Sequence, residues 1–420
     1  MTRTLTPHQA ATIKSTVPVL ATHGLTITTQ FYADVITSNP VLKNIFNNTH
    51  QATGHQARAL AGALYAYAAN ISDLGVLSPA IELICHKHAS LVIKPEMYDI
   101  VGTYLLKNMK LVLGDAATPE IMDAWGAAYW QLADIMIAKE KGLYEETGYW
   151  KEWQEFKIVG KEKESEEITS FYFEPVDEGL KVPKYRPGQY VSVRVFVEEL
   201  DGGVWQARQY SLSDAPGKKY LRISVKKEAG VEVGEPKHVA EPGYLSNILH
   251  GKKNVGDVVQ LTHPFGDFYY EEKEAGKDAP AVLISAGVGL TCLMSILKTL
   301  VEEHSSRPIS WVHGARDNKT RAFKKQIDEL ARENKNLHSV AFSSSPASDE
   351  VQGTDYDVKG RIDLGKVDKE VLFTDNVTAQ YFICGPTTFM VDTENKLKDL
   401  GVSSDRIKVE LFGTGGVPRI

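Results

Sequence analysis

The chain has 420 residues, 43% of them hydrophobic and 24% charged, which is typical of globular proteins and excludes a disordered or fibrous chain. At roughly 150 residues per domain, this length predicts about three domains. Lysine and arginine number 47 against 54 aspartates and glutamates, and the net charge of -7 excludes the basic excess of a nucleic-acid-binding protein.

Three cysteines are too widely separated for a disulfide framework or a CxxC metal site, and they fit a reducing compartment best. The N-terminus lacks the continuous apolar core of a signal peptide. Residues 279–297 carry no charge, but their proline, glycines, serine and threonine residues indicate a buried strand, a turn and a helix start rather than a membrane span. We therefore expect a cytoplasmic protein with no transmembrane segment.

Residues 1–148 are expected to form an all-α domain. Apolar residues recur at spacings of four, three and four in the run Trp125, Tyr129, Leu132 and Met136. Four X-Pro pairs, at residues 39–40, 78–79, 94–95 and 118–119, mark sites where helices should begin. The positions of these prolines predict about six to eight helices.

Residues 153–270 show a period of two, which predicts short strands. In residues 190–197 the valines at 191, 193, 195 and 197 share one face. In the next clear strand, one face carries Leu221, Ile223 and Val225 and the other carries Arg222, Ser224 and Lys226. Glycine-containing turns separate these strands, so we expect an antiparallel β-barrel.

Residues 277–420 alternate between apolar strands and amphipathic helices. The predicted strands are 281–286, 309–313 and 380–384, and the predicted helices are 293–301 and 322–333. Such alternation is typical of a doubly wound parallel sheet in an α/β domain. The overall fold class is thus multidomain, with an all-α, an antiparallel β-barrel and an α/β part.

Two turns follow buried strands of the α/β part. Gly287-Val288-Gly289 precedes a helix, where glycines let the backbone approach a pyrophosphate at the helix N-terminus. This motif alone is a weak signal, because Cys292 stands where a third glycine would be sought. Cys384-Gly385-Pro386 follows another strand, so both turns should meet at the carboxyl edge of the sheet. Taken alone, Cys384 would be better interpreted as a small buried thiol.

A strand of the barrel carries Arg208-Gln209-Tyr210-Ser211, after a turn that ends at Tyr190. Arg208 offers a fork for a pyrophosphate, Tyr210 a flat face for a ring system, and Ser211 a hydroxyl for a ring nitrogen. The alternative is an ordinary strand with an exposed arginine and a packed tyrosine.

These motifs, in this order, resemble those of the ferredoxin reductase-like flavoproteins. The resemblance implies that Tyr190 and the Arg208–Ser211 strand bind FAD, that Gly243 and Ser246 form a second phosphate-binding turn, and that the remaining two turns bind NAD(P)H. One departure is that Leu290-Thr291-Cys292 replaces the usual ending in proline. The missing proline predicts a looser start to the following helix.

A lone histidine in a helix is usually a surface or hydrogen-bonded residue, but His88 stands within a longer run of residues 85–98. That run resembles the proximal segment of flavohaemoglobins. Several residues earlier in the chain resemble the distal helices of the same family, namely Phe31-Tyr32, Asn39-Pro40, Ile45-Phe46, Gln56 and Leu60. The match covers the full chain: a globin domain (1–148), an FAD-binding β-barrel domain (153–270) and an NAD(P)-binding domain (277–420).

The resemblance implies that His88 is the axial ligand of haem iron. His86 lies about 200° away around a helix and is not expected to bind the iron. Tyr98 and Glu140 resemble the proximal partners that give the imidazole anionic character and favour oxygen activation. Glu140 alternatively fits a solvated charge between two lysines, although helical spacing also allows it to face inward with Met136.

On the distal side, the resemblance implies that Tyr32 donates a hydrogen bond to bound oxygen and that Gln56 assists. Leu60 should narrow the pocket, one helical turn after Gln56. Phe46 should pack on the haem. Without the family, Tyr32 and Phe46 would be interpreted as ordinary core aromatics.

Electron transfer in the family implies further residues. Lys87 and Glu410 resemble the pair that lies between haem and flavin. The segment that follows Glu410 is Leu411-Phe412-Gly413-Thr414, in which Phe412 is expected to cover the flavin ring. Leu411 and Thr414 replace the usual cysteine and proline, which predicts an altered flavin potential or packing.

The resemblance implies an NAD(P)H-dependent nitric oxide dioxygenase with haem b and FAD as cofactors. Its partners would be the small molecules NO, O2 and NAD(P)H, and we expect a monomer. The alternatives are an oxygen sensor or store with an auxiliary reductase, and a general NAD(P)H-dependent ferric or quinone reductase. Preference between NADH and NADPH depends on groups near the ribose, for which His313, Arg316 and Arg321 are candidates.

Overall fold

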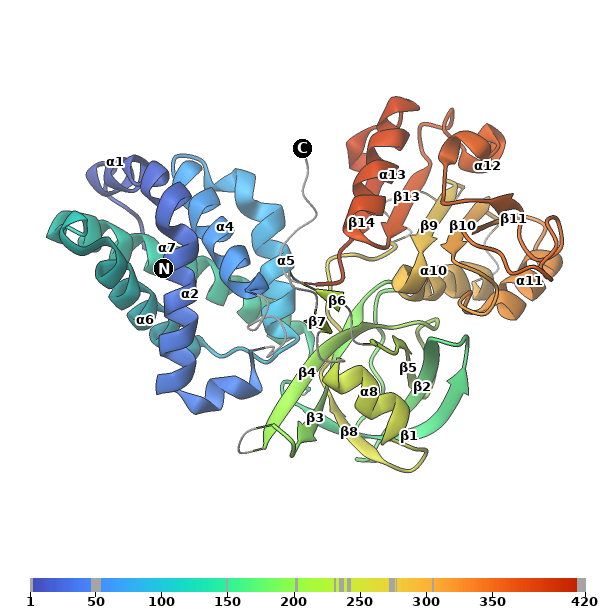
Figure 1. The fold of residues 1–420 in the computed structure, drawn as a ribbon, viewed down its shortest axis with the longest axis horizontal. Helices are drawn as coiled ribbons and strands as arrows, with labels where there is room; N and C mark the ends of the chain where they lie inside the picture. Colours follow the sequence, from blue (N-terminus) through green and yellow to red (C-terminus); the bar gives the residue numbers. More distant parts are fainter. Residues whose placement is uncertain are drawn as a thin grey trace. The chain divides into compact units, whose positions relative to one another are not determined.

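A computed structural model of the chain is shown in Figure 1. It describes residues 3–46, 54–148, 150–200, 203–229, 232–233, 238–239, 243–271, 276, 278–303 and 306–413. The chain divides into two compact units, which are Met1–Trp153 with Arg194–Arg208, and Gln154–Val193 with Gln209–Ile420.

The N-terminal part is helical, as predicted. Its described residues form the α-helices α1 (Pro7–Ser15), α2 (Val17–Ser38), α4 (His55–Ala69), α5 (Ser78–Ala89), α6 (Pro95–Leu113) and α7 (Pro119–Glu146). Three 3-10 turns, η1 (Pro40–Asn44), η2 (Leu74–Leu77) and η3 (Gly114–Ala116), connect them. Proline occupies the first turn of α1, α2, α5, α6 and α7, where its missing N–H costs no hydrogen bond.

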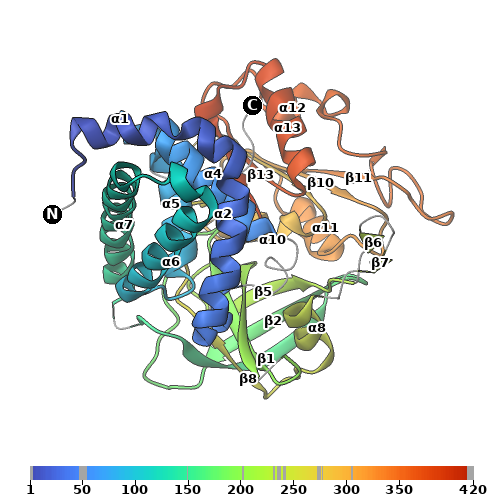
Figure 2. The same ribbon diagram turned by 60° about the vertical axis from the view of Figure 1, so that its left-hand side comes forward.

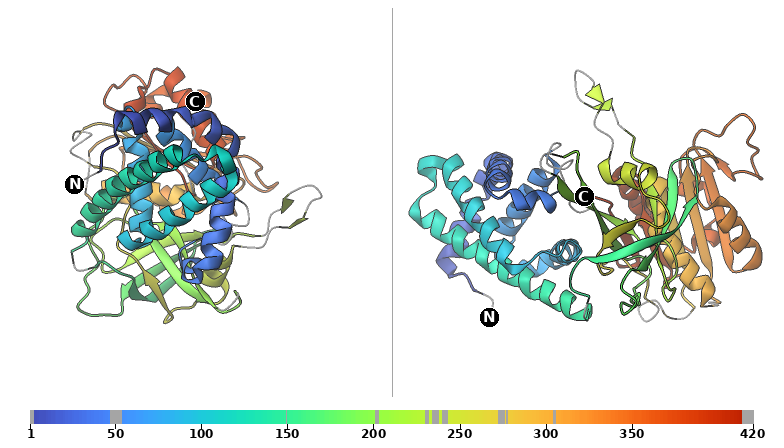
Figure 3. Two further views of the ribbon diagram at one scale, coloured as in Figure 1. Left: turned by 90° about the vertical axis from the view of Figure 1, so that its left-hand side faces the viewer. Right: turned by 90° about the horizontal axis from the view of Figure 1, so that it is seen from below.

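These helices pack around one apolar core. Helix α2 lies against α4 and α6, and α7 lies against α1 and α5 (Figure 2). The left view of Figure 3 looks onto α7, which runs diagonally across this part of the chain. The predicted stripe of α7 faces inward, since Trp125 is 2% and Met136 7% exposed.

The middle of the chain forms a six-stranded sheet in the order β4-β3-β8-β1-β2-β5. Its strands are β1 (Gln154–Lys163), β2 (Ile168–Pro175), β3 (Tyr190–Val197), β4 (Val204–Ser211), β5 (Leu221–Lys226) and β8 (Val258–Leu261). The registered pairs β1/β2, β1/β8 and β2/β5 are antiparallel. A bridge from Leu212, just after β4, to Ile223 of β5 joins the two edges and confirms the barrel. Two short strands, β6 (Glu232–Val233) and β7 (His238–Val239), and helix α8 (Tyr244–Gly251) complete this part.

The barrel strands bury their predicted apolar face, and β5 buries the other face as well. The valines of β3 are at most 4% exposed, and Leu221, Ile223 and Val225 are fully buried. Alternation predicts that Arg222 and Ser224 lie on the opposite face, yet they are only 1% and 4% exposed. Arg222 is covered by the ring of Phe323, 5.2 Å from its guanidinium carbon.

The C-terminal part is a parallel sheet in the order β12-β11-β10-β9-β13-β14. Its strands are β9 (Ala281–Ala286), β10 (Ile309–Ala315), β11 (Leu337–Ser343), β12 (Val358–Lys359), β13 (Gln380–Cys384) and β14 (Ile407–Glu410). All of its pairs are parallel. Its α-helices are α10 (Leu290–Glu302), α11 (Lys324–Glu333), α12 (Lys369–Leu372) and α13 (Thr387–Asp399), and three 3-10 turns are η4 (Gly287–Gly289), η5 (Leu364–Lys366) and η6 (Ser404–Arg406).

Helices cover both faces of this sheet, as a doubly wound fold requires. Residues of α10 and α11 join one buried cluster with Leu283 and Trp311, while α12 and α13 join another with Val282 and Ile284. The chain moves outward from β9 through β10, β11 and β12, and then returns to the other side of β9 as β13. The carboxyl ends of β9 and β13 are therefore the switch point at which such sheets bind ligands.

Within the ranges that the structure describes, no helix is both long enough and apolar enough to cross a membrane.

Candidate functional site

A histidine with two polar partners lies at the C-terminal end of α5. The Nδ1 atom of His88 lies 3.0 Å from the hydroxyl of Tyr98 on α6 and 2.9 Å from Oε1 of Glu140 on α7. Tyr98 donates its own hydrogen bond to the same carboxylate oxygen, at 2.6 Å. Three helices thus bring together the predicted proximal residues, which are 10 and 52 positions from His88 in sequence.

Burial keeps this arrangement ordered. Glu140 is 2% exposed and is therefore not the solvated charge that its lysine neighbours suggested. Lys139 instead pairs with Glu82. Burial, followed by the charge of Glu140, raises the pKa of Tyr98 well above its usual range, so its phenol remains a hydrogen-bond donor.

The residues around His88 suit a porphyrin iron better than a metal held by protein alone. Both contacts of its ring use Nδ1, which leaves Nε2 to coordinate a metal. Among the residues that the structure describes, no group of three or more His, Cys, Asp or Glu side chains could hold a metal ion. A metal bound through one histidine must bring its remaining ligands with it, as haem does. His86 lies 3.1 Å from Glu82, its partner on the same helix.

The predicted distal residues gather on α2, α4 and the turn after η1. The ring centroids of Tyr32 and Phe46 are 5.3 Å apart at 88°, an edge-to-face contact. Both rings and Leu60 pack, half-buried, against the helical core, and Gln56 lies one turn before Leu60 on α4. Burial raises the pKa of Tyr32 above its usual range, which keeps its hydroxyl protonated.

In the barrel, the predicted FAD strand is the C-terminal half of β4. Arg208, Gln209 and Tyr210 are half-buried and Ser211 is 6% exposed. The N–H of Leu212 donates to the carbonyl of Gln189 at 2.9 Å, so this strand ends beside the segment that leads to Tyr190. Tyr190, 4% exposed, begins β3.

Gly243 and Ser246 lie together at the start of α8. The Ser246 hydroxyl donates to the carbonyl of Gly243 at 3.1 Å and accepts from the N–H of Glu228 at 3.2 Å. A Cβ atom at position 243 would lie 3.0 Å from the Glu228 side chain. A glycine therefore fits this tight turn better than a larger residue does.

The two turns predicted to bind NAD(P)H are in direct contact at the switch point. A Cβ atom on Gly289 would lie 2.2 Å from the carbonyl oxygen of Cys384, whereas one on Gly287, at φ +56°, would meet nothing within 4 Å. The turn therefore packs on one side and is open on the other. The space around Gly385 is also restricted, because a Cβ atom there would lie 2.7 Å from the Phe389 side chain. Pro386 occupies the N-cap position of α13.

The start of α10 is held by side chains rather than by the missing proline. Thr291 donates to the carbonyl of Val288 at 3.1 Å, and Cys292 donates to that of Gly289 at 3.4 Å. Leu290 is 1% exposed and begins the helix. Burial, reinforced by the adjacent Cys292 thiol, raises the pKa of Cys384, so the Cys384 thiol remains uncharged.

The residues predicted between haem and flavin lie in separate units. Lys87 is half-buried on α5, next to His88. Glu410 is 5% exposed at the end of β14, and Leu411 follows it. Phe412 is 42% exposed, Gly413 has φ +148°, and Thr414 lies outside the described residues.

Of the three residues considered for the ribose, Arg316 alone is exposed. Its side chain is 58% accessible and lies 2.8 Å from Glu167. His313 is 2% exposed and contacts the Ser285 hydroxyl, while Arg321 is 8% exposed and donates to a carbonyl.

Known proteins resemble this chain along its whole length. Residues 29–136 match the Globin family, and residues 283–395 match the Oxidoreductase NAD-binding domain family. A flavohemoprotein of Bordetella parapertussis is 46% identical over 418 residues, which cover 98% of this chain and 100% of that one. A flavohemoprotein of Rhizobium meliloti is 44% identical over 96% of both chains. The chain belongs to the flavohaemoprotein family.

Solved structures agree with membership of the flavohaemoprotein family. A flavohemoglobin from Malassezia yamatoensis, solved with bound FAD and heme, has a TM-score of 0.83 at 28% identity and covers 97% of this chain and 100% of its own. The FAD/NAD-binding domain of a nitric oxide dioxygenase from Vibrio cholerae has a TM-score of 0.53 at 34% identity, covering 62% of this chain and 98% of its own. The predicted combination of globin, barrel and parallel sheet is confirmed.

One group of residues in this flavohaemoprotein escaped the sequence analysis. Asp214, three residues after the predicted FAD strand, is buried beside Arg222 and also pairs with the half-buried Lys298. Only its position, three residues after Ser211, could have pointed to Asp214 in the sequence. The sequence does not show that α10 packs on this segment.

Proposed function

We propose that this flavohaemoprotein is an NAD(P)H-dependent nitric oxide dioxygenase that converts NO and O2 to nitrate and so detoxifies nitric oxide. In this proposal residues 1–148 bind haem b, residues 153–270 bind FAD and residues 277–420 bind NAD(P)H. The relatives support these cofactors, since the Malassezia structure contains FAD and heme and the Vibrio structure is that of a nitric oxide dioxygenase domain.

The observation that carries the proposal is the acidic hydrogen-bond system on His88. Glu140 accepts from both Tyr98 and the Nδ1 side of His88, and only 2% of Glu140 is exposed. A buried carboxylate at Nδ1 increases the electron donation of Nε2 to a bound metal. Stronger donation favours activation of oxygen over its reversible storage.

The remaining residues have roles that follow from their positions. Tyr32 keeps its proton and can donate a hydrogen bond on the opposite side of a haem, with Gln56 of α4 as a second polar group and with Phe46 and Leu60 as apolar walls.

In the reductase part, β4 supplies the Arg208 guanidinium to a pyrophosphate and the Tyr210 ring to a flavin. The open side of the Gly287–Gly289 turn leaves backbone N–H groups for the pyrophosphate of NAD(P)H. Bound FAD would supply the conversion between the two electrons of a hydride and the single electrons that haem iron accepts, and the haem held by His88 would be the site of the reaction between O2 and NO.

The test is a count of nitrate formed per NADH oxidised by the purified chain in the presence of NO and O2, with His88→Ala as the control. Near-stoichiometric nitrate that disappears in His88→Ala supports the dioxygenase. Tight oxygen binding without nitrate would identify an oxygen sensor or store. An unchanged flux from NADH to ferric or quinone acceptors in His88→Ala, again without nitrate, would identify a general reductase.

A further inference from the structure

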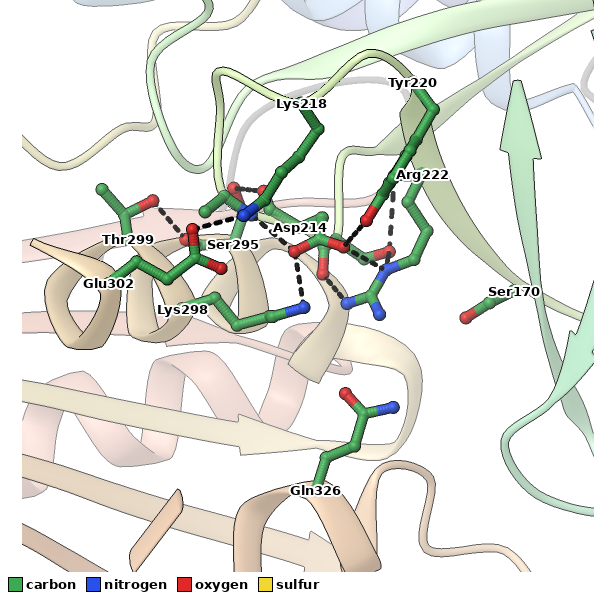
Figure 4. A network of polar contacts seen from close by, with 12 residues as sticks. Ser170, Asp214, Lys218, Tyr220, Arg222, Ser295, Lys298, Thr299, Glu302 and Gln326 are labelled. Carbon is green, nitrogen blue, oxygen red and sulfur yellow. Dashed lines mark hydrogen bonds and ion pairs between the residues drawn. The ribbon is translucent and has the colours of Figure 1, made fainter. Parts of the chain in front are cut away.

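A buried carboxylate joins the barrel to the parallel sheet within the second compact unit (Figure 4). Asp214 lies between β4 and β5 and is 2% exposed. Its Oδ1 atom is 2.6 Å from Nζ of Lys298 on α10, and its Oδ2 atom is 3.6 Å from Nε of Arg222 on β5. One carboxylate therefore has a cationic partner on each side of the boundary.

Asp214 is also held through its backbone and through neutral donors. Its carbonyl accepts hydrogen bonds from Ser295 of α10 at 2.7 Å and from Tyr185 at 2.8 Å. Its side chain accepts from the N–H of Ala215 at 2.9 Å and from Tyr220 at 3.1 Å. The residue cannot shift without breaking several bonds, two of which lead to α10.

The two ends of this connection are the segments proposed to bind the flavin and the nicotinamide. Asp214 follows Ser211, the last residue of β4, by three positions, and Ser295 follows Leu290, the first residue of α10, by five. A helix rises about 1.5 Å per residue, so Ser295 lies only about 9 Å along the axis from Gly289, the last residue of the Gly287–Gly289 turn. Because α10 continues directly from that turn, a displacement at Ser295 and Lys298 moves the turn as well.

The ion pairs of Asp214 are expected to contribute little to the free energy of unfolding. Desolvation of two buried charges offsets most of their attraction, so buried ion pairs contribute little net stability. What they do fix is relative position, since misplacement leaves a charge buried without its partner. Burial opposes ionisation of Asp214, but Arg222 and Lys298 outweigh it and lower its pKa, so the carboxylate is charged at neutral pH.

We propose that Asp214 is a positioning residue for hydride transfer, which holds the nicotinamide-binding turn at the correct distance from the flavin-binding strand through Ser295 and Lys298. This inference rests on the proposed function, because it assumes that the β4 strand binds FAD and that the turn binds NAD(P)H. Asp214 would not touch either cofactor.

The experiment is a single-turnover measurement of flavin reduction in the full chain loaded with FAD. The variants are Lys298→Met and Ser295→Ala, each of which breaks one bond to α10 while it leaves Asp214 and Arg222 in place. NADH is the reductant in one series, and dithionite, which needs no nicotinamide site, is the reductant in the other. Lys218→Met is the matched control, because Lys218 and Glu302 form an ion pair across the same boundary at 2.5 Å but are 32% and 40% exposed.

The limiting rate of flavin reduction by NADH should fall about tenfold in Lys298→Met and about threefold in Ser295→Ala, since sub-ångström misplacement slows transfer. The half-saturating NADH concentration should change less than the rate, and the isotope effect with NADH deuterated at the transferred position should rise. Reduction by dithionite and the rates of Lys218→Met should match the wild type. Lys298→Arg, which keeps the charge, should recover most of the lost rate.

The proposal is overturned if Lys298→Met and Ser295→Ala lower the melting temperature but reduce their flavin with NADH at the wild-type limiting rate. An equal loss in Lys218→Met would also overturn it, because any contact at this boundary would then suffice. A wild-type chain whose bound flavin is reduced by neither NADH nor NADPH would instead refute the proposed function, and this inference with it.

Discussion

A single methyl group at position 289 tests whether the two turns at the switch point must lie in contact. Gly289 has φ -59°, which all residues adopt readily, so Gly289→Ala alters only the space that the residue fills. The new Cβ would lie 2.2 Å from the carbonyl oxygen of Cys384 and 2.7 Å from the N–H nitrogen of Gly385. These are backbone atoms at the end of β13, which cannot rotate away as a side chain could.

The turn must therefore move by about 0.8 Å to restore even the 3.0 Å separation below which Cβ contacts are essentially never found. A misplacement of about 1 Å in a positioning element can slow catalysis about 100-fold, and overpacking costs about 1–3 kcal/mol of stability. We expect the rate of flavin reduction by NADH to fall about 100-fold in Gly289→Ala, while dithionite still reduces the flavin.

The assay is stopped-flow absorbance of the bound flavin, with Gly251→Ala as the control. A Cβ atom at position 251 would meet nothing within 4 Å, so that variant should behave as the wild type does. A wild-type rate in Gly289→Ala would refute the reasoning, because it would mean that the contact between the turns has no bearing on the transfer.

Three further variants test the haem site and the buried histidine. Glu140→Gln removes the charge that accepts hydrogen bonds from Tyr98 and His88. We therefore expect resonance Raman to show a lower iron–histidine stretching frequency, and we expect the free energy of unfolding to fall by about 1.5–3 kcal/mol. An unchanged frequency would contradict the proposed electron donation. Tyr32→Phe should accelerate oxygen dissociation, measured by flash photolysis, because the proposed distal donor is lost; an unaltered dissociation rate would eliminate Tyr32 from that role. Burial, with the charge of Arg321 adding to it, lowers the pKa of His313 to about 3. An unfolded histidine titrates near 6.5, so the unfolded state binds more protons below that pH, and stability is lost as the pH falls from about 6.5 toward about 3. At about 1.4 kcal/mol per pKa unit, urea titrations should show that the free energy of unfolding of the wild type falls by about 2 kcal/mol between pH 7 and pH 5, whereas that of His313→Gln does not. Equal losses in both proteins would argue against His313 as the cause.

Local pattern and turn chemistry predicted much of the α/β part. The strands predicted at 281–286 and 380–384 have those bounds in the structure, because both are short, continuous apolar runs that end at glycine. The helix predicted at 322–333 begins two residues later, at Lys324, since Phe323 has φ +58° and cannot be part of an α-helix. Propensity gives no sign of such a backbone angle at a phenylalanine.

By itself, the sequence determined the order of the three parts, the two turns at the sheet edge and the histidine that resembles a haem ligand. Only the tertiary structure decided which side chains meet across long separations. Glu140 reaches His88 from 52 residues away, and Lys298 reaches Asp214 across the boundary between barrel and sheet. Periodicity shows which residues share a face, but it does not show what covers that face. For that reason Arg222, on the face that alternation left polar, is buried at 1% exposure beneath a ring from another part of the chain.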